Sequence, residues 1–155
     1  MTIDHDSFAR RTVLSAALGA SFAIAAGPAA AGVLPSTEAA NLTLAADFCA
    51  SWAKGKVDVE QMVATYFHPD CIVRVMDSAM TAHGHGGTKA MLYGWLEGKR
   101  RFDLKVIDSR ALGPLVIQTR EDVTYSPGAA PHVDKIACVF VIADGKIKEW
   151  SDYFR

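Results

Sequence analysis

The last third of the chain alternates apolar and polar residues with a period of two, and short turn motifs interrupt this alternation. Asp144-Gly145 is the strongest of these motifs, because this pair favours a two-residue turn between antiparallel strands. Gly113-Pro114 and Ser126-Pro127-Gly128 indicate two further turns. The sequence therefore predicts strands at residues 102–112, 115–125, 132–143 and 146–154.

The segment before these strands has the signals of helices. Ser36 or Thr37 can cap a helix that ends near Gly55, and Asp58 begins a capping-box pattern that starts a second helix. A strand is expected at 71–76, and a glycine-rich turn at 83–87 leads into a third helix at 88–96. Helices followed by a run of strands predict an α+β fold, with N-terminal helices and a curved mixed or antiparallel sheet enclosing a pocket.

The first 31 residues resemble an export signal and are predicted to lie outside the fold. Arg10-Arg11 precede an uncharged run rich in Ala and Gly, and small residues before Ala31 suit a cleavage site. The paired arginines and weakly apolar core resemble a twin-arginine signal, whose partner is the corresponding export machinery. We expect cleavage near Ala31, which leaves one domain at residues 32–155. The mature protein is then periplasmic or secreted. The alternative is that the segment is not cleaved and acts as a membrane anchor.

Composition limits the partners and cofactors of this domain. The chain has 155 residues with a formal net charge of −1, which argues against nucleic-acid binding. Cys49, Cys71 and Cys138 are odd in number and form neither a C-x-x-C pair nor a zinc spacing, although one disulfide stays open. His83 and His85 lack an evident third metal ligand, so we predict no metal and no cofactor.

Two short segments carry the candidate catalytic residues. On the last strand Trp150, Asp152 and Phe154 are two residues apart and share one face. Arg120 and Asp122 share a face of an earlier strand in the same way. If both faces line one cavity, it holds two aspartates and an arginine, which suit an acid, a base and a bridge.

Simpler interpretations of the same residues exist. Lys146 and Lys148 fall on the same alternate face as Trp150, so Asp152 can instead be a surface carboxylate paired with one of them. Arg120 and Asp122 can likewise form a weak cross-strand ion pair on a solvated sheet.

The sequence resembles the limonene-1,2-epoxide hydrolase family in its element order and in two short motifs. These motifs are Arg120-x-Asp122 and the closing Gly145-Lys146-Ile147-x-x-Trp150-x-Asp152-Tyr153-Phe154. That family belongs to the SnoaL-like, cone-shaped folds named after nuclear transport factor 2, which also include polyketide cyclases and ketosteroid isomerases. The resemblance implies that Asp152 is the general base on water, Asp122 is the general acid on the epoxide oxygen, and Arg120 bridges them without a cofactor.

The sequence departs from this family on the first strand. The family has a tyrosine and an asparagine there that position the attacking water, and Val73 and Val75 take their places here. We predict that these valines line the substrate pocket with Tyr66, Trp150 and Phe154.

Three functions follow from the resemblance and the departure. The first is hydrolysis of a small apolar epoxide. The second is isomerisation or cyclisation of a ketone by proton transfer, which suits a dry pocket. The third is non-catalytic binding of an apolar ligand in the periplasm.

Apolar residues at Ala137, Val139 and Val141 on one sheet face also predict a homodimer.

Overall fold

The computed structural model describes residues 36–53, 57–75 and 80–154. The predicted export signal at 1–31 and Met76, the last residue of the predicted first strand, lie outside the described residues. Within this part of the chain there are three α-helices and one six-stranded sheet, so the predicted α+β class is confirmed. None of the helices described has the length and apolar character needed to span a bilayer.

The helices and strands follow one another in two groups. The first group holds α1 (Ser36–Trp52), α2 (Val59–Tyr66), β1 (Phe67–Val75), β2 (Met80–His83), α3 (Gly84–Leu96) and a 3-10 turn (Glu97–Lys99). The second holds β3 (Arg101–Leu112), β4 (Leu115–Tyr125), β5 (His132–Ala143) and β6 (Lys146–Phe154).

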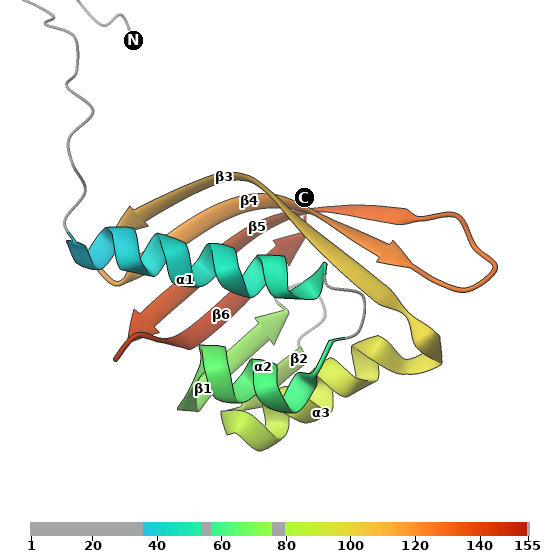
Figure 1. Cartoon of the computed structure of the whole chain (residues 1–155), viewed down its shortest axis with the longest axis horizontal. Helices are drawn as coiled ribbons and strands as arrows, with labels where there is room; N and C mark the ends of the chain where they lie inside the picture. Colours follow the sequence, from blue (N-terminus) through green and yellow to red (C-terminus); the bar gives the residue numbers. More distant parts are fainter. Residues whose placement is uncertain (1–35, 54–56, 76–79, 155) are drawn as a thin grey trace, which may run out of the picture. The chain divides into compact units, whose positions relative to one another are not determined.

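The sheet is mixed, curved and not closed. Its strand order is β2-β1-β6-β5-β4-β3; β1 pairs with β6 in parallel, and all the other neighbours are antiparallel. The long strands β3 to β6 arch over α1, while α2 and α3 lie beside β1 and β2 (Figure 1). The helices therefore cover one face of the sheet and leave room for a pocket beneath the arch.

The turns predicted from the sequence set the register of the long strands. Asp144 and Gly145 both have positive φ, 51° and 66°, which is the conformation of a type I′ hairpin turn between β5 and β6. Gly113, with φ of 56°, begins the two-residue turn between β3 and β4. The turn between β3 and β4 aligns Val106 with Arg120, and the turn between β5 and β6 brings Cys138 opposite Asp152.

The structure differs from the expected elements of the first group in three places. β1 begins at Phe67, directly after α2, rather than at Cys71, and a register shift between Phe67 and Ile72 accommodates Pro69, which has no N–H to donate. The short strand β2 was not predicted. Helix α3 begins at Gly84 rather than near Thr88, because Gly84 with φ of 62° turns the chain sharply from β2 into the helix.

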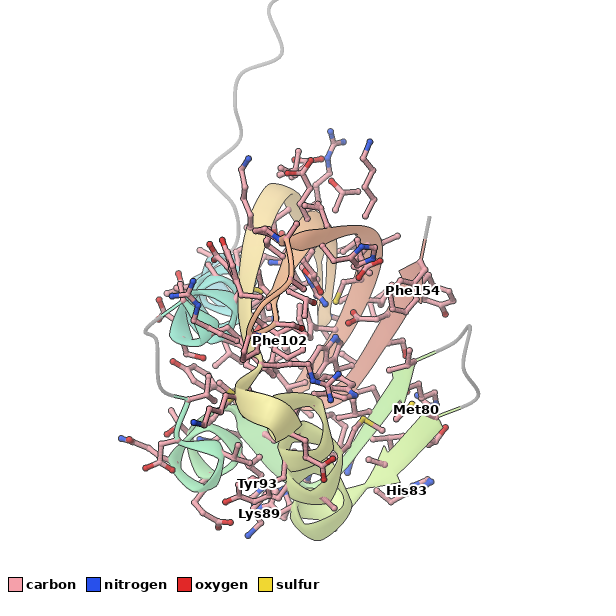
Figure 2. All side chains as sticks on the ribbon, turned by 90° about the vertical axis from the view of Figure 1, so that its right-hand side faces the viewer. Met80, His83, Lys89, Tyr93, Phe102 and Phe154 are labelled. Atoms are coloured by element: carbon pink, nitrogen blue, oxygen red, sulfur yellow. The ribbon has the colours of Figure 1, made fainter. Side chains whose placement is uncertain are left out.

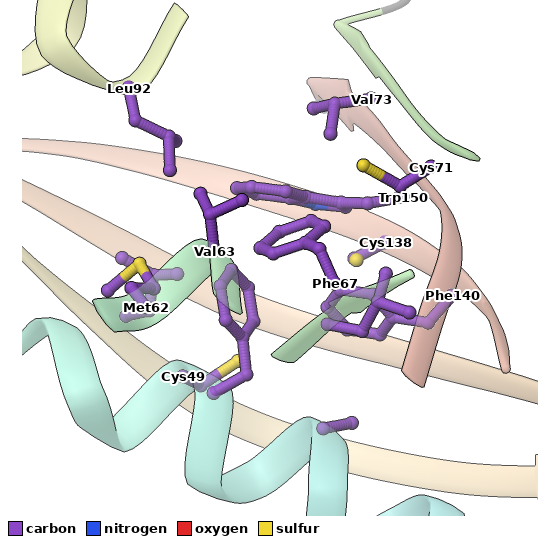
Figure 3. Packing of buried hydrophobic residues seen from close by; sticks show 14 of the residues in the cluster. Cys49, Met62, Val63, Phe67, Cys71, Val73, Leu92, Cys138, Phe140 and Trp150 are labelled. Atoms are coloured by element: carbon purple, nitrogen blue, oxygen red, sulfur yellow. The ribbon is translucent and has the colours of Figure 1, made fainter. Parts of the chain in front are cut away.

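The core is dominated by aromatic rings packed edge to face. Phe48 on α1 is fully buried and contacts five rings, with a centroid distance of 5.0 Å to Trp150 and 5.4 Å to Phe67. Around Trp150, Val63 of α2 and Leu92 of α3 complete the packing (Figure 3). The sheet and all three helices therefore meet at one cluster, which fixes Trp150.

The opposite face of the sheet is partly apolar. Ala137, Val139 and Val141 are half-buried there, and Ile117, which pairs with Val139, is exposed. A homodimer through this face stays a prediction.

Removal of the central ring tests this description of the core. Phe48→Ala should lower the free energy of unfolding by about 3–5 kcal/mol, because a buried aromatic ring leaves a cavity that its neighbours only partly fill. Tyr93→Ala, at an exposed aromatic on α3, should cost less than about 1 kcal/mol. Urea denaturation of both variants measures the difference, and similar losses would contradict the packing described.

Candidate active site

A cavity of about 300 Å³ opens beneath the arch of the sheet. Fourteen of the described residues line it, and most are aromatic or aliphatic: Trp52, Val75, Met80, Trp95, Arg100, Phe102, Leu104, Asp122, Thr124, Asp134, Ile136, Trp150, Asp152 and Phe154. Figure 2 looks toward this end of the domain, with Phe102, Met80 and Phe154 contributed by three different strands. Such a volume suits a small molecule rather than a macromolecule.

A bulge in β6 aims Trp150 and Asp152 into this cavity. The pairing of β5 with β6 shifts between Val141 and Ile142, so that Val141 faces Glu149 while Ile142 faces Ile147. Lys148 takes up the extra residue, and Ile147, Trp150 and Asp152 all become buried. The lysine-lined face predicted by strict alternation therefore does not form, and neither Lys146 nor Lys148 pairs with Asp152 among the described residues.

The inward face of β4 supplies a row of polar side chains. Gln118 and Arg120 are buried and Asp122 follows at the edge of the cavity. Gln118 accepts a hydrogen bond from Cys49 Sγ and donates one to Ser109 Oγ, at 3.4 and 3.3 Å. This glutamine was not predicted as part of the site, although its position two residues before Arg120 places it on the same face.

Arg120 holds both aspartates at once. Its Nε and Nη2 donate to the two oxygens of Asp122 at 2.7 and 3.0 Å, and Nη2 also donates to Asp152 Oδ2 at 2.5 Å. The arginine side chain is fully buried, whereas Asp122 is 17% and Asp152 is 9% exposed. The predicted candidates on two separate strands thus form one connected group, and the surface alternatives are not what the structure shows.

Burial and charge act on this group in opposite directions. Burial disfavours the charged form of Arg120, but the facing carboxylates outweigh it and hold its pKa well above the usual value. Burial raises the pKa of Asp122, against the hydrogen bonds from Arg120, and the charges of Asp152 and Asp134 raise it further. Asp122 is therefore the carboxyl of the pair that retains a proton more readily than an ordinary aspartate.

Two further groups hold Asp152. Trp150 Nε1 donates to Asp152 Oδ1 at 2.6 Å, so each oxygen of this carboxylate has a donor from the protein. Cys138 lies opposite Asp152 on β5, and burial together with the nearby Asp152 carboxylate raises the pKa of Cys138 well above its usual value. The side chain of Asp152, the candidate base, is thus fixed in orientation, and it also lines the cavity.

Two buried donors near this group have no hydrogen-bond partner among the described residues: Trp52 Nε1 and Arg120 Nη1. Trp52 itself lines the cavity. A buried donor without an acceptor is costly, so an acceptor from a bound ligand or water would stabilise the site.

The five residues predicted to line the pocket divide into two sets. Trp150, Phe154 and Val75 line the cavity, and Val75 lies beside Asp152 in the parallel pairing of β1 with β6. Val73 is buried in the core, and Tyr66 packs against Phe48 with ring centroids 5.7 Å apart. Neither is among the described residues that line the cavity: β1 reaches the cavity only at its last residue, and Tyr66 is the last residue of α2.

The cavity also has polar residues that the sequence reasoning missed. Thr124 and Asp134 line it on β4 and β5, and Arg100 lines it after the turn that follows α3. The signal for Thr124 was its spacing, two residues after Asp122. Asp134 had no such signal, because the apolar Val133 and the charged Lys135 on either side of it share one face, so polarity does not alternate along the sequence there.

The three cysteines are free and buried. Burial raises the pKa of Cys49 to about 12, so the thiol stays protonated and is a poor nucleophile. His85 Nε2 lies 3.0 Å from the carbonyl oxygen of Phe67 rather than beside another metal-ligating side chain. No group of three or more possible metal ligands occurs within the described residues.

No known family model matches the sequence, and no curated protein matches it either. Several solved structures are similar in fold. They include an epoxide hydrolase of Mycobacterium tuberculosis described as similar to the limonene enzyme, with 22% identity, a TM-score of 0.64, and coverage of 76% of this chain and 84% of that chain.

Two further similar structures have other descriptions. A putative SnoaL-like polyketide cyclase from Jannaschia sp. CCS1 is 13% identical, with a TM-score of 0.64 over 79% of this chain and 90% of that one. A hypothetical protein with a ketosteroid isomerase-like fold, from Catenulispora acidiphila and in complex with trimethylamine, is 14% identical, with a TM-score of 0.62 over 71% and 83%. The chain has the predicted cone-shaped fold named after nuclear transport factor 2; at these identities, the similarities show the fold alone.

Replacement of Arg120 should show how much the buried cation stabilises the fold next to Asp122 and Asp152. We expect Arg120→Met to lower the free energy of unfolding by about 3–5 kcal/mol at neutral pH, because the buried carboxyl groups of Asp122 and Asp152 lose the cation that both contact. Burial raises the pKa of Asp122, so protonation neutralises this carboxyl above the ordinary range for an aspartate, and the difference from wild type should shrink as the pH falls into that range.

Denaturation across this pH range checks the expectation, with Arg110→Met as the control. Arg110 is an exposed arginine paired only with Asp108 among the described residues, and its loss should have little effect at any pH. A loss at Arg120 that does not depend on pH would mean that packing, rather than charge, explains the effect.

Proposed function

We propose that the protein is a cofactor-free hydrolase that adds water to a small, largely apolar epoxide. The observation that carries this proposal is the group formed by Asp122, Arg120 and Asp152 at the wall of an apolar cavity. The similarity to a solved epoxide hydrolase agrees with it, although that similarity extends only to the fold.

The proposed reaction uses one proton donor and one proton acceptor. Asp152, ionised, takes a proton from water, and the resulting hydroxide oxygen attacks a ring carbon of the epoxide. The bond from that carbon to the ring oxygen breaks, and Asp122 gives its proton to this oxygen. The product is a vicinal diol, and a proton moves from Asp152 to Asp122, through solvent or along the shared contacts, to restore the starting state.

The burial of Asp122 supports its assignment as the acid. Its raised pKa favours the protonated form that the reaction needs, and Arg120 stabilises the carboxylate left after proton transfer. Trp150 takes part in the proposal as a positioning residue, since its indole N–H fixes one oxygen of Asp152. Val75 does not hold water, so the attacking water would depend mainly on Asp152 itself.

Substitution of either acid tests the proposal. Asp152→Asn and Asp122→Asn should each lower kcat/KM for limonene oxide by about 10²–10⁴-fold, because each removes one proton transfer. Diol formation in ¹⁸O-labelled water measures the rate and shows that the new oxygen comes from solvent. Asp108→Asn, an exposed aspartate on β3, is the matched control and should retain wild-type activity.

The pH profile gives a second expectation from the same assignment. The rate should fall at high pH, as Asp122 loses the proton that it donates. Because the pKa of Asp122 is raised, the high-pH limb should lie above the ordinary range for an aspartate. Hydrolysis that persists in Asp152→Asn would contradict these roles.

A second candidate function is proton transfer on a ketone, as in an isomerase or cyclase. The placement of Val75 beside Asp152 favours it, since an apolar neighbour suits a base that removes a proton from carbon rather than from water. Asp122, or Arg120 Nη1, which has no hydrogen-bond partner among the described residues, would then stabilise the enolate oxygen.

Deuterium exchange separates the two reactions. If proton transfer is the function, incubation with a cyclic ketone such as menthone in D₂O should place deuterium on the carbon next to the carbonyl, without addition of water. NMR follows the exchange, and Asp152→Asn should abolish it. If neither reaction occurs, and ligand binding is the same after both acids are replaced by asparagine, the protein is a binding module for an apolar ligand.

A further inference from the structure

The wall of the cavity is mostly apolar, and a few polar side chains interrupt it. Trp52, Trp95 and Phe102 are among the apolar residues, whereas Thr124 on β4 and Asp134 on β5 are polar. Asp134 is the register partner of Asp122 on the neighbouring strand. Directly opposed residues of antiparallel strands have Cβ atoms about 5 Å apart, so Asp134 lies next to the acid candidate.

Asp134 is far from the base candidate by the same reasoning. Cys138 is the partner of Asp152, and Asp134 precedes it by four residues on β5. At the rise of an antiparallel strand, this separation is about 13 Å along the backbone. A ligand group at Asp134 would therefore lie on the side of the cavity nearer to Asp122 than to the backbone of Asp152.

The carboxylate of Asp134 has acceptor capacity to spare. Its side chain is 32% exposed, and its one hydrogen-bond partner among the described residues is His132 Nε2, at 3.0 Å. An ionised carboxylate can accept about four hydrogen bonds. A wholly apolar ligand that filled the cavity would take water from this carboxylate and offer no donor, which costs about 1–3 kcal/mol or more.

We propose that Asp134, with Thr124 beside it, determines the specificity of this cavity by binding a hydroxyl group of the substrate. The substrate class is then a cyclic, mostly apolar epoxide with a hydroxyl on a carbon close to the epoxide ring. This inference rests on the proposed function for the position of the epoxide oxygen at Asp122. The preference for a hydroxyl-bearing ligand follows from the cavity itself.

The charges around the cavity favour a hydroxyl over an ammonium group. In the resting state of the proposed reaction Asp122 holds a proton, and the remaining carboxylates, Asp134 and Asp152, are then balanced by Arg120 and Arg100. Arg100 is held at the end of α3, where its Nε and Nη2 donate to the carbonyl oxygens of Glu97 and Gly94. A neutral donor leaves this balance unchanged. A carbonyl group has no proton to donate to Asp134.

Three ligands of one carbon skeleton test this inference without any reaction. Limonene has no polar group, carveol adds a hydroxyl, and carvone has a carbonyl in its place. Calorimetry on the wild-type protein should show carveol binding about tenfold more tightly than limonene or carvone, and tenfold corresponds to about 1.4 kcal/mol. Asp134→Leu should abolish this preference, and Asp134→Asn, which keeps an acceptor oxygen, should retain part of it.

The matched control is Lys135→Leu, at the adjacent exposed position on the opposite face of β5. It should leave the preference for carveol unchanged. Circular dichroism of all the variants shows whether each is folded, and Asp134→Asn keeps the test valid if Asp134→Leu does not fold. Carveol binding that is no tighter than limonene binding, or that is unchanged in a folded Asp134→Leu protein, would overturn the inference.

A kinetic comparison separates this inference from the proposed function. The epoxides of carveol and limonene should differ about tenfold in kcat/KM in favour of the hydroxylated substrate, and Asp134→Leu should remove the difference. Hydrolysis of both epoxides with no effect of Asp134→Leu on their ratio would overturn the inference alone. Preferential carveol binding with no hydrolysis of either epoxide would reject the proposed function and retain the hydroxyl site.

Discussion

The buried guanidinium of Arg120 is the constraint on which the rest of the site depends. An arginine side chain with no exposed surface must be neutralised where it lies, and three short hydrogen bonds to Asp122 and Asp152 do this. Both partners must then reach it from separate strands, so the register of β4, β5 and β6 cannot shift without leaving a charge unpaired. The aromatic core that surrounds Trp150 excludes water from this group and makes each charge interaction stronger than at a surface.

This charged group suits two reactions, and a single neighbouring position distinguishes them. Hydrolysis and enolisation both need a carboxylate at Asp152 and an electrophilic partner at Asp122 and Arg120. They differ in whether the base acts on water or on carbon. Val75 lies at the point where β1 approaches Asp152, and its side chain cannot orient water. The fold therefore explains why the proposed acid and base lie together, while the choice between the proposed reactions depends on how the bound substrate and water share the space beside Val75.

The sequence predicted the parts of the fold that local patterns determine. The four long strands follow from alternation and turn residues. The candidate catalytic residues Arg120, Asp122 and Asp152 follow from their spacing along β4 and β6. Strand β2 was not predicted, because four residues are too few to show alternation. Only its pairing with β1 identifies it as a strand. The bulge at Lys148 was missed because only the mismatch between β5 and β6 reveals it, and without that bulge the lysines would share the face of Trp150. Asp134 gained its role from its cross-strand neighbour Asp122, a relation that exists only once the strands are paired.

That pairing also links specificity to acid strength. Asp134 contributes to the raised pKa of Asp122, since a second negative charge disfavours ionisation of the first. A hydroxyl bound to Asp134 donates to its carboxylate and draws negative potential away from Asp122. Binding of the preferred ligand would then ease the release of the proton that Asp122 donates. One carboxylate would thus both select the substrate and adjust the acid, so the high-pH limb measured with a hydroxylated substrate should lie below that measured with a wholly apolar one.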